Sequence, residues 1–152
     1  MGESCYVGHK CRIEAWDSYL DDLFSPIINM GNNVKINSNC HIGAINMIEI
    51  GDDCLFGSNL MLIDHSHGET TFNNSKIHPC ERKLYSKGKI IIEERCWLAE
   101  NVVVLPGVTI GEGSIIGANA VVTKNIPKYS VAVGNPAKVV KTICDSDRDR
   151  EE

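Results

Sequence analysis

Histidine is the residue in this sequence best suited to acid–base chemistry, and four of the five histidines lie between residues 41 and 78. His65 and His67 belong to the run DHSHG, at the end of an apolar stretch and the start of a long polar segment. An imidazole exchanges its proton near neutral pH, which suits a general base. From the residues alone, His65 is either such a base or an ordinary histidine of a surface loop.

Other residues around His65 have weaker claims to a role. Asp64 could orient the imidazole, although neighbouring residues of a strand point to opposite faces, which argues against it. His67 is the alternative base and would share the face of His65 if the strand continued; otherwise it shapes the loop or contacts an acceptor. For His41 and His78 an ordinary structural role is the simpler interpretation.

The elements that position these residues follow a repeat of six. A six-residue repeat cannot stay on one face of a helix, but it can in strands, because six is a multiple of two. A small or apolar residue follows each aliphatic position four residues later. The aliphatic positions are Ile92, Leu98, Val104, Ile110, Ile116 and Val122, and upstream Met30, Ile36, Ile42, Ile50, Phe56 and Leu62.

Tight turns must separate these short strands. The triplets GNN, GDD, GEG and GAN at 31–33, 51–53, 111–113 and 117–119 supply residues that tolerate a positive φ. Three hexads close a triangular coil of about 18 residues, and stacked coils bury each other's faces in a solenoid. The alternative fold, an antiparallel β-sandwich, would not require aliphatic residues to recur at a constant interval of six. Residues 48–49 read as a two-residue insertion.

The organisation predicted is a single domain of 152 residues. Coils occupy about 7–16 and 28–127, and two segments leave the repeat: the first excursion, 17–26, and the second excursion, 66–89. A loop as long as the second is usually functional or disordered. Residues 128–144 form a C-terminal cap, and 145–152 a charged tail.

Composition narrows the class of protein. The net charge of −5 weakly disfavours nucleic-acid binding and leaves small-molecule partners open. No apolar run approaches the roughly 20 residues of a transmembrane helix, and the N-terminus has no apolar secretory core. The seven cysteines include no C-x-x-C pair, so we expect reduced, mostly packing cysteines in a cytoplasmic protein.

The hexads, DHSHG, WLAEN at 97–101, VLPGVTIG at 104–111, TKNIP at 123–127 and GNPAKVVK at 134–141 together resemble the hexapeptide-repeat acyltransferases. The resemblance is greatest to the sugar O-acetyltransferases of capsule and lipopolysaccharide synthesis, with galactoside and maltose acetyltransferases as relatives. It implies an all-β fold, a left-handed parallel β-helix, assembled as a homotrimer with active sites between subunits. It also implies acetyl-coenzyme A as donor, a sugar hydroxyl as acceptor and no tightly bound cofactor.

The resemblance also assigns roles around the acetyl group. His65 matches the family's catalytic base, and Asn37 matches an asparagine beside the acceptor, where its amide could bond the hydroxyl or the oxyanion; otherwise Asn37 is a turn residue. Trp97, expected to point outward, would line the acetyl and acceptor cleft or be buried between subunits. The backbone amides near Ala99 and Glu100 could bond the thioester carbonyl.

Further positions match those along which the family binds coenzyme A, here called the donor track, and those near the acceptor. Small residues there let the pantetheine arm lie flat, and lysines meet the nucleotide; solvated surface lysines are the alternative. The expected donor contacts are Trp97, Ala99, Ala118, Thr123, Lys124, Lys138 and Lys141. The expected acceptor contacts, mainly from the two excursions, are His67, Trp97 and Tyr85.

Three alternatives stay open. The same machinery could acylate an amine, for which a base matters less than for a hydroxyl, or the solenoid could be a non-catalytic assembly module. The hexapeptide carbonic anhydrases hold zinc through three histidines at a subunit interface. Their pair of ligands five residues apart is absent here, so no metal site is expected.

Overall fold

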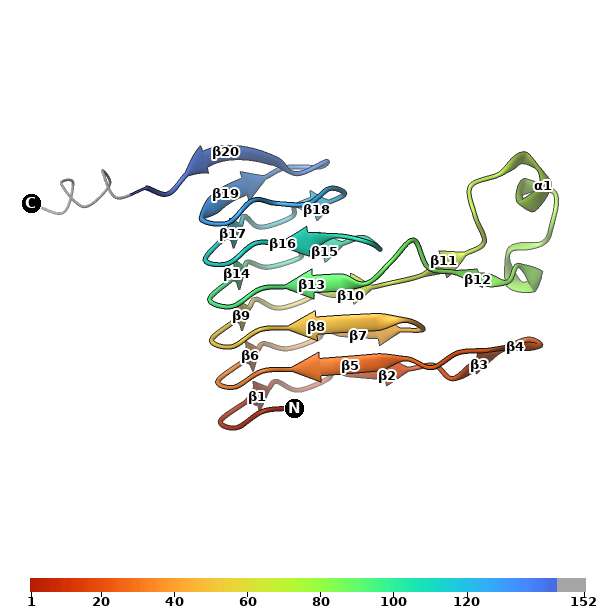
Figure 1. Cartoon of the computed structure of the whole chain (residues 1–152), viewed down its shortest axis with the longest axis horizontal. Helices are drawn as coiled ribbons and strands as arrows, with labels where there is room; N and C mark the ends of the chain where they lie inside the picture. The colour runs from red at the N-terminus through yellow and green to blue at the C-terminus, as the bar shows by residue number, and fades with distance from the viewer. Residues whose placement is uncertain (145–152) are drawn as a thin grey trace, which may run out of the picture.

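The computed structural model describes residues 1–144 and shows stacked coils with three parallel faces (Figure 1). The seven-stranded face contains β1 (Tyr6–Val7), β6 (Lys35–Ile36), β9 (Leu55–Phe56), β14 (Trp97–Leu98), β17 (Ile115–Ile116), β19 (Ser130–Val133) and β20 (Lys138–Thr142). The five-stranded face contains β2 (Arg12–Ala15), β7 (His41–Ala44), β10 (Met61–Ile63), β15 (Val103–Val104) and β18 (Val121–Val122). The four-stranded face contains β5 (Ile27–Met30), β8 (Met47–Ile50), β13 (Ile90–Ile92) and β16 (Thr109–Ile110).

The register between coils confirms the predicted period. Trp97 pairs with Ile115, which is 18 residues further along the chain. Lys35 pairs with Leu55, so the coil between them has 20 residues and contains the expected two-residue insertion. Its predicted position at residues 48–49 was wrong, because those residues are paired within β8. The chain instead turns at Ile45–Asn46, between β7 and β8.

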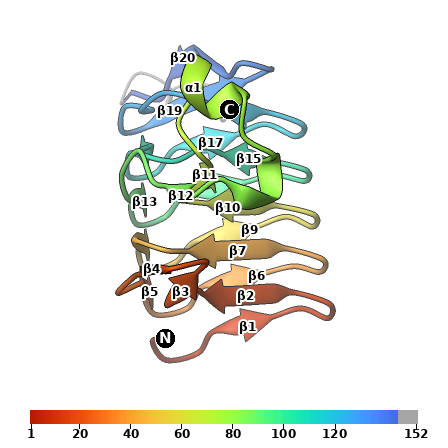
Figure 2. The same ribbon diagram turned by 90° about the vertical axis from the view of Figure 1, so that its right-hand side faces the viewer.

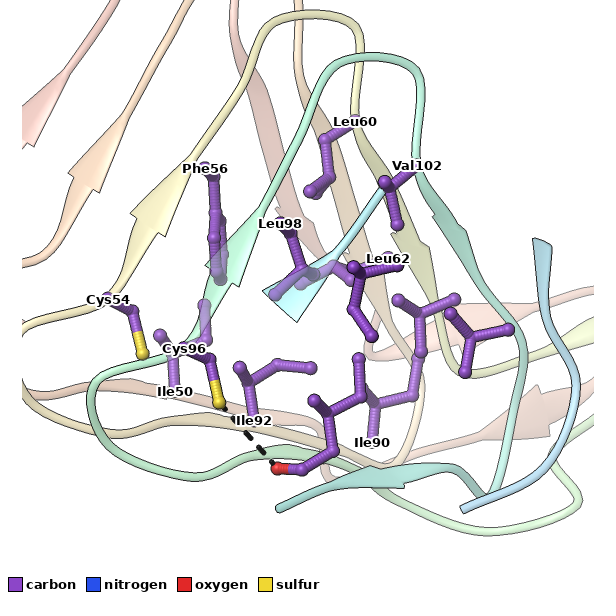
Figure 3. Close-up of a cluster of buried hydrophobic side chains, with 14 of the residues drawn as sticks. Ile50, Cys54, Phe56, Leu60, Leu62, Ile90, Ile92, Cys96, Leu98 and Val102 are labelled. Carbon is purple, nitrogen blue, oxygen red and sulfur yellow. Dashed lines mark hydrogen bonds between the residues drawn. The ribbon is translucent and has the colours of Figure 1, made fainter. Parts of the chain in front are cut away.

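The core is the column of residues that the hexads predict to point inward. All twelve aliphatic positions of the repeat are buried, and eleven of them are no more than 3% exposed. Figure 3 shows part of this column, with side chains from two successive coils that include Phe56, Leu98 and the thiols of Cys54 and Cys96. The buried cysteines therefore act as small packing residues, as expected.

The corners repeat a left-handed backbone conformation. Asn33, Asp53, Gly113 and Asn119, the third residues of the four predicted triplets, have φ of 53°, 58°, 65° and 62°. Gly51 is required for close packing between coils, because a Cβ there would lie 2.6 Å from the backbone nitrogen of Glu94 in the next coil. Positive φ at Asn39, Asn59 and Asn101 was not predicted; these residues lie at the same corner as Asn119, whereas Asn33, Asp53 and Gly113 lie at another.

Both excursions leave the coils at one corner, between the five- and four-stranded faces, which we call the five–four corner (Figures 1 and 2). The first contains the hairpin β3 (Ser18–Tyr19) and β4 (Asp22–Leu23). The second contains β11 (Ser66–His67) paired with β12 (Leu84–Tyr85), the helix α1 (Phe72–Ser75) and the 3-10 turn Pro79–Glu81.

The two excursions also contact each other. The hydroxyl of Tyr19 donates to the carbonyl of Cys80 at 2.9 Å. Lys83 forms an ion pair with Asp22 at 2.5 Å. Segments about 60 residues apart in the sequence are thus joined above one corner of the coils.

The C-terminal boundary differs from the prediction. Residues 128–144 were expected to be a cap, but β19 still pairs in parallel with β17 and so continues the last coil. Only β20, antiparallel to β19, closes the seven-stranded face. The predicted charged tail, 145–152, lies outside the described residues. In the described part of the chain no helix is long and apolar enough to cross a membrane.

The stacked core predicts a strong contrast between two leucines. Leu98 is fully buried, whereas Leu23 in the hairpin is 85% exposed. We expect Leu98→Ala to lower the free energy of unfolding by about 2–5 kcal/mol and Leu23→Ala to change it by less than about 0.5 kcal/mol. Urea denaturation followed by circular dichroism measures both; equal effects would contradict the assignment of the core.

Candidate active site

His65 follows the end of β10, at the five–four corner, and its side chain is 13% exposed. Its Nδ1 lies 3.1 Å from Oδ1 of Asp64. Asp64 is fully buried, and its two oxygens accept the backbone N–H groups of Ile45 and Asn46, both at 2.9 Å. The argument against Asp64 as an orienting residue was wrong, because the strand ends at Ile63 and the alternation of faces ends with it.

This arrangement fixes the proton on the imidazole. The Asp64 carboxylate already accepts two backbone N–H groups, and a carboxylate oxygen has no proton of its own to give to the ring. The neutral ring of His65 must then donate from Nδ1. Its Nε2 keeps a lone pair and can accept a proton from a substrate.

Two hollows meet at His65. The lower hollow, towards the N-terminal coils, has a volume of ≈ 260 Å³, and the upper hollow, towards the C-terminal coils, has a volume of ≈ 400 Å³. Ile63, His65 and Ser66 line both. A base between two binding spaces is the arrangement that group transfer between two substrates requires.

The lower hollow includes three residues of the first coil, Arg12, Glu14 and Trp16, which sequence reasoning did not single out. It is lined by Arg12, Glu14, Trp16, His41, Gly43 and His67 as well as the three shared residues. The Trp16 ring lies 6.4 Å from the His65 ring and 6.3 Å from that of Tyr19. His67, an expected acceptor contact, packs edge-on against Tyr19 at 5.5 Å. Trp16 could have been noticed, because it directly precedes the first excursion as Asp64–His65 precede the second.

Glu14 joins the polar side chains of this hollow. Its Oε2 lies 3.1 Å from Nε of Arg12, 3.2 Å from Nε1 of Trp16 and 3.3 Å from Nε2 of His41. Burial raises the pKa of Glu14, but hydrogen bonds from Trp16 and His41 and the charge of Arg12 outweigh it and hold that pKa below its ordinary value. Glu14 is therefore ionised at neutral pH.

Gly43 forms the floor between the two histidines. A Cβ at this position would lie 3.4 Å from Nε2 of His41 and 3.8 Å from Cε1 of His65. Gly43 pairs with Glu14 below and Ile63 above in the five-stranded face. The missing side chain leaves space for a ligand beside the imidazole.

The upper hollow contains two of the predicted residues. Thr123, expected on the donor track, lines it two coils above Ile63, and the exposed Lys124 follows at the same corner. Tyr85, expected at the acceptor, also lines this upper hollow. Apolar residues such as Met61, Val104 and Leu105 form much of its wall.

The remaining predicted residues lie on the other side of the five-stranded face. Trp97, 48% exposed on the seven-stranded face, points outward as predicted. Asn37, Ala99 and Ala118 follow strands of that face, at its corner with the five-stranded face, which we call the seven–five corner. Within one chain they are therefore not brought together with His65.

Two details of the predicted donor set change. The amide of Ala99 donates to the carbonyl of Ile116 at 2.9 Å, so it is not available to a thioester carbonyl. Lys138 and Lys141 lie in β20 on the seven-stranded face, whereas Lys124 lies at the five–four corner. Within one chain, the three lysines therefore do not form one cluster: two lie on the seven-stranded face and the third lies at the five–four corner.

Other candidate sites are weaker. A further hollow, ≈ 620 Å³, borders the four-stranded face and holds none of the predicted residues. Its Lys128 is already paired with Glu93 at 3.3 Å and Glu112 at 3.2 Å. Within residues 1–144 no group of three His, Cys, Asp or Glu is placed to hold a metal ion.

Comparison with known proteins identifies the family. Residues 89–124 match the bacterial transferase hexapeptide (six repeats), and residues 47–59 match the hexapeptide repeat of succinyl-transferase. The chain is 36% identical over 148 residues to a protein of Escherichia coli K12 with the provisional name lipopolysaccharide biosynthesis O-acetyl transferase WbbJ, covering 90% of this chain and 75% of that protein. The chain belongs to the hexapeptide-repeat acetyltransferases.

Solved structures of acetyltransferases agree with this assignment. The maltose O-acetyltransferase of Clostridium difficile 630 is 30% identical with a TM-score of 0.74, over 95% of this chain and 70% of that one. A galactoside acetyltransferase in complex with coenzyme A is 31% identical with a TM-score of 0.72, over 92% and 68%. The chain spans only 53–55% of similar acetyltransferases from Schizosaccharomyces pombe and Staphylococcus aureus.

The geometry of this acetyltransferase predicts different tautomers for two of its histidines. His65 donates from Nδ1 to Asp64, whereas Nδ1 of His78 accepts the backbone N–H of Cys80 at 3.3 Å. At a pH where both rings are neutral, ¹⁵N NMR should show His65 protonated at Nδ1 and His78 at Nε2. In Asp64→Ala, His65 should lose this preference while His78 keeps its own. An Nε2–H tautomer of His65 in the unmodified protein would contradict the proposed orientation.

Proposed function

We propose that this protein is an acetyl-coenzyme A-dependent O-acetyltransferase that acetylates a saccharide hydroxyl, with His65 as general base. The observation that carries the proposal is the Asp64–His65 pair at the junction of two hollows. The E. coli relative's name supports an acceptor in lipopolysaccharide or capsule synthesis. The maltose and galactoside relatives support a sugar.

The reaction follows from the orientation of the base. A hydroxyl is a poor nucleophile at neutral pH, so Nε2 of His65 removes its proton as the oxygen attacks the thioester carbon. Asp64 stabilises the imidazolium that forms. When the tetrahedral intermediate collapses, the C–S bond breaks and the imidazolium returns the proton to the departing coenzyme A thiolate.

We assign the donor to the upper hollow and its continuation along the C-terminal coils. Thr123 lies in this hollow and the exposed Lys124 lies next to it. The mainly apolar wall suits a pantetheine arm, and a lysine at its end suits a phosphate. The coenzyme A complex of the galactoside relative supports this type of donor.

We further propose a homotrimer of left-handed coils with active sites between neighbours, as the family resemblance implies. Asn37 and Trp97 lie across the five-stranded face from His65, so one chain cannot direct all three at one acetyl group. A neighbouring subunit that presents its seven–five corner to His65 can supply both. The exposed Trp97 and Leu55, paired on the seven-stranded face, offer apolar surface for such a contact.

The first test is the transfer reaction itself. We expect release of coenzyme A from acetyl-coenzyme A to depend on a sugar, and His65→Ala to lower kcat by roughly 10²–10⁴-fold. His78→Ala removes an exposed histidine of the second excursion and should leave turnover within about twofold of the unmodified enzyme.

Two outcomes would argue against this function. Wild-type turnover in His65→Ala would remove the base from the mechanism. Robust turnover of amino sugars, with sugars that lack an amine unreactive, would indicate the alternative, N-acylation.

The composite site predicts complementation. His65→Ala and Asn37→Ala should each be nearly inactive as homotrimers. After co-refolding in equal amounts, about a quarter of the sites would combine an intact His65 with a neighbour's intact Asn37. Activity should rise towards that fraction, whereas no recovery would show that both residues serve the same subunit's site.

A further inference from the structure

The lower hollow has no predicted donor residue, and the first coil contributes Arg12, Glu14 and Trp16 to its lining. Building on the proposed function, we infer that it is the acceptor subsite and takes one uncharged pyranose ring, stacked on Trp16 with a hydroxyl bound by Glu14. The first coil then selects the sugar, and the DHSHG corner performs the chemistry on it.

Trp16 is placed and oriented for stacking. The indole is 38% exposed, and its ring centre lies 6.4 Å from that of His65 and 6.3 Å from that of Tyr19. Its Nε1–H is already donated to Glu14, so the ring is held in place and offers its apolar face to a ligand. The C–H face of a pyranose is a suitable partner for an aromatic ring, and its hydroxyls remain free at the edge.

Glu14 retains an acceptor for one of those hydroxyls. The contacts from Arg12, Trp16 and His41 all reach Oε2. Within residues 1–144, the hydrogen bonds from side chains to Glu14 all end on Oε2 and none on Oε1. A hydroxyl bound at Oε1 would orient the ring, and a neighbouring hydroxyl could then reach Nε2 of His65.

Size and charge limit the acceptor. At ≈ 260 Å³ the hollow is smaller than the roughly 300–1,000 Å³ of pockets for drug-sized ligands, so it suits a single ring. Its one guanidinium, Arg12, is paired with the Glu14 carboxylate. Lys87 and Thr123–Lys124 belong to the upper side of the corner. The lower hollow therefore offers no unpaired cation to a uronic or other acidic sugar.

Substitutions at Trp16 test the stacking. Trp16→Leu keeps an apolar side chain but removes the ring face, and should raise the KM for a neutral methyl hexopyranoside roughly 5–10-fold. The KM for acetyl-coenzyme A should change by less than about twofold. Trp16→Phe restores a ring and should recover most of the acceptor affinity.

The matched control is Phe72→Leu, which removes an aromatic ring that is 75% exposed on α1, away from both hollows. It should change neither KM. Melting temperature and coenzyme A binding, measured for each variant, report folding. Equal effects of Trp16→Leu on both substrates, no effect on either, or no recovery in Trp16→Phe would overturn the assignment.

The charge selection is tested with methyl hexopyranosides against the corresponding methyl uronides. The unmodified enzyme should have a higher kcat/KM for the neutral sugars than for the uronides. Glu14→Gln should bring the ratio of these two kcat/KM values closer to one. A preference of the unmodified enzyme for uronides would overturn the inference. Failure here is distinct from failure of the proposed function, because His65→Ala would still abolish transfer to whichever sugar reacts.

Discussion

One buried carboxylate connects the fold to the chemistry. Asp64 accepts the amides of Ile45 and Asn46 in the coil below and contacts the imidazole of His65 in its own coil. An unpaired buried carboxylate would be costly, so these donors are needed for its charge to remain in the interior. The two additional residues of the 20-residue coil lie where the chain turns at Ile45–Asn46. A local departure from the repeat thus supplies the donors that hold the base in position.

The stacking of coils then decides what surrounds the base. Because successive coils pair in register, residues of different repeats form columns along each corner. The five–four corner aligns Trp16 and Gly43 with His65 on one side, and Thr123 with it on the other. Both excursions emerge from this same corner. They contact each other there, because Tyr19 bonds the carbonyl of Cys80 and Lys83 pairs with Asp22. The stacked coils therefore set the order of the proposed acceptor hollow, His65 and the proposed donor hollow along one edge.

Much of this arrangement could be predicted from the sequence. Hexads such as Ile92–Leu98–Val104 determine the inward face, because a period of six fits strands and excludes a helix. The triplets predicted turns with positive φ at 31–33, 51–53, 111–113 and 117–119, which the structure has at residues 33, 53, 113 and 119, and DHSHG pointed to His65 as the candidate base. These features are local, so neighbouring residues reveal them.

Features that depend on stacking were not predictable in the same way. Asp64 was discounted because strand alternation was extended past the end of β10. Glu14 and Trp16 can be connected with His41 and His65, about 30 and 50 positions later, only through the register between coils. That register depends on the lengths of the first excursion and of the 20-residue coil, which both lie between these residues. The amide of Ala99 was expected to be free, but coil-to-coil hydrogen bonding occupies it.

The most direct measurement of the central claim is a crystal structure of the assembled enzyme with coenzyme A. The account predicts that the pantetheine arm follows Thr123 into the upper hollow and that its sulfur ends within about 4 Å of Nε2 of His65. It also predicts that Trp97 of a neighbouring subunit borders the arm. A thiol that ends in the hollow on the four-stranded face, or a donor bound away from His65, would contradict the account.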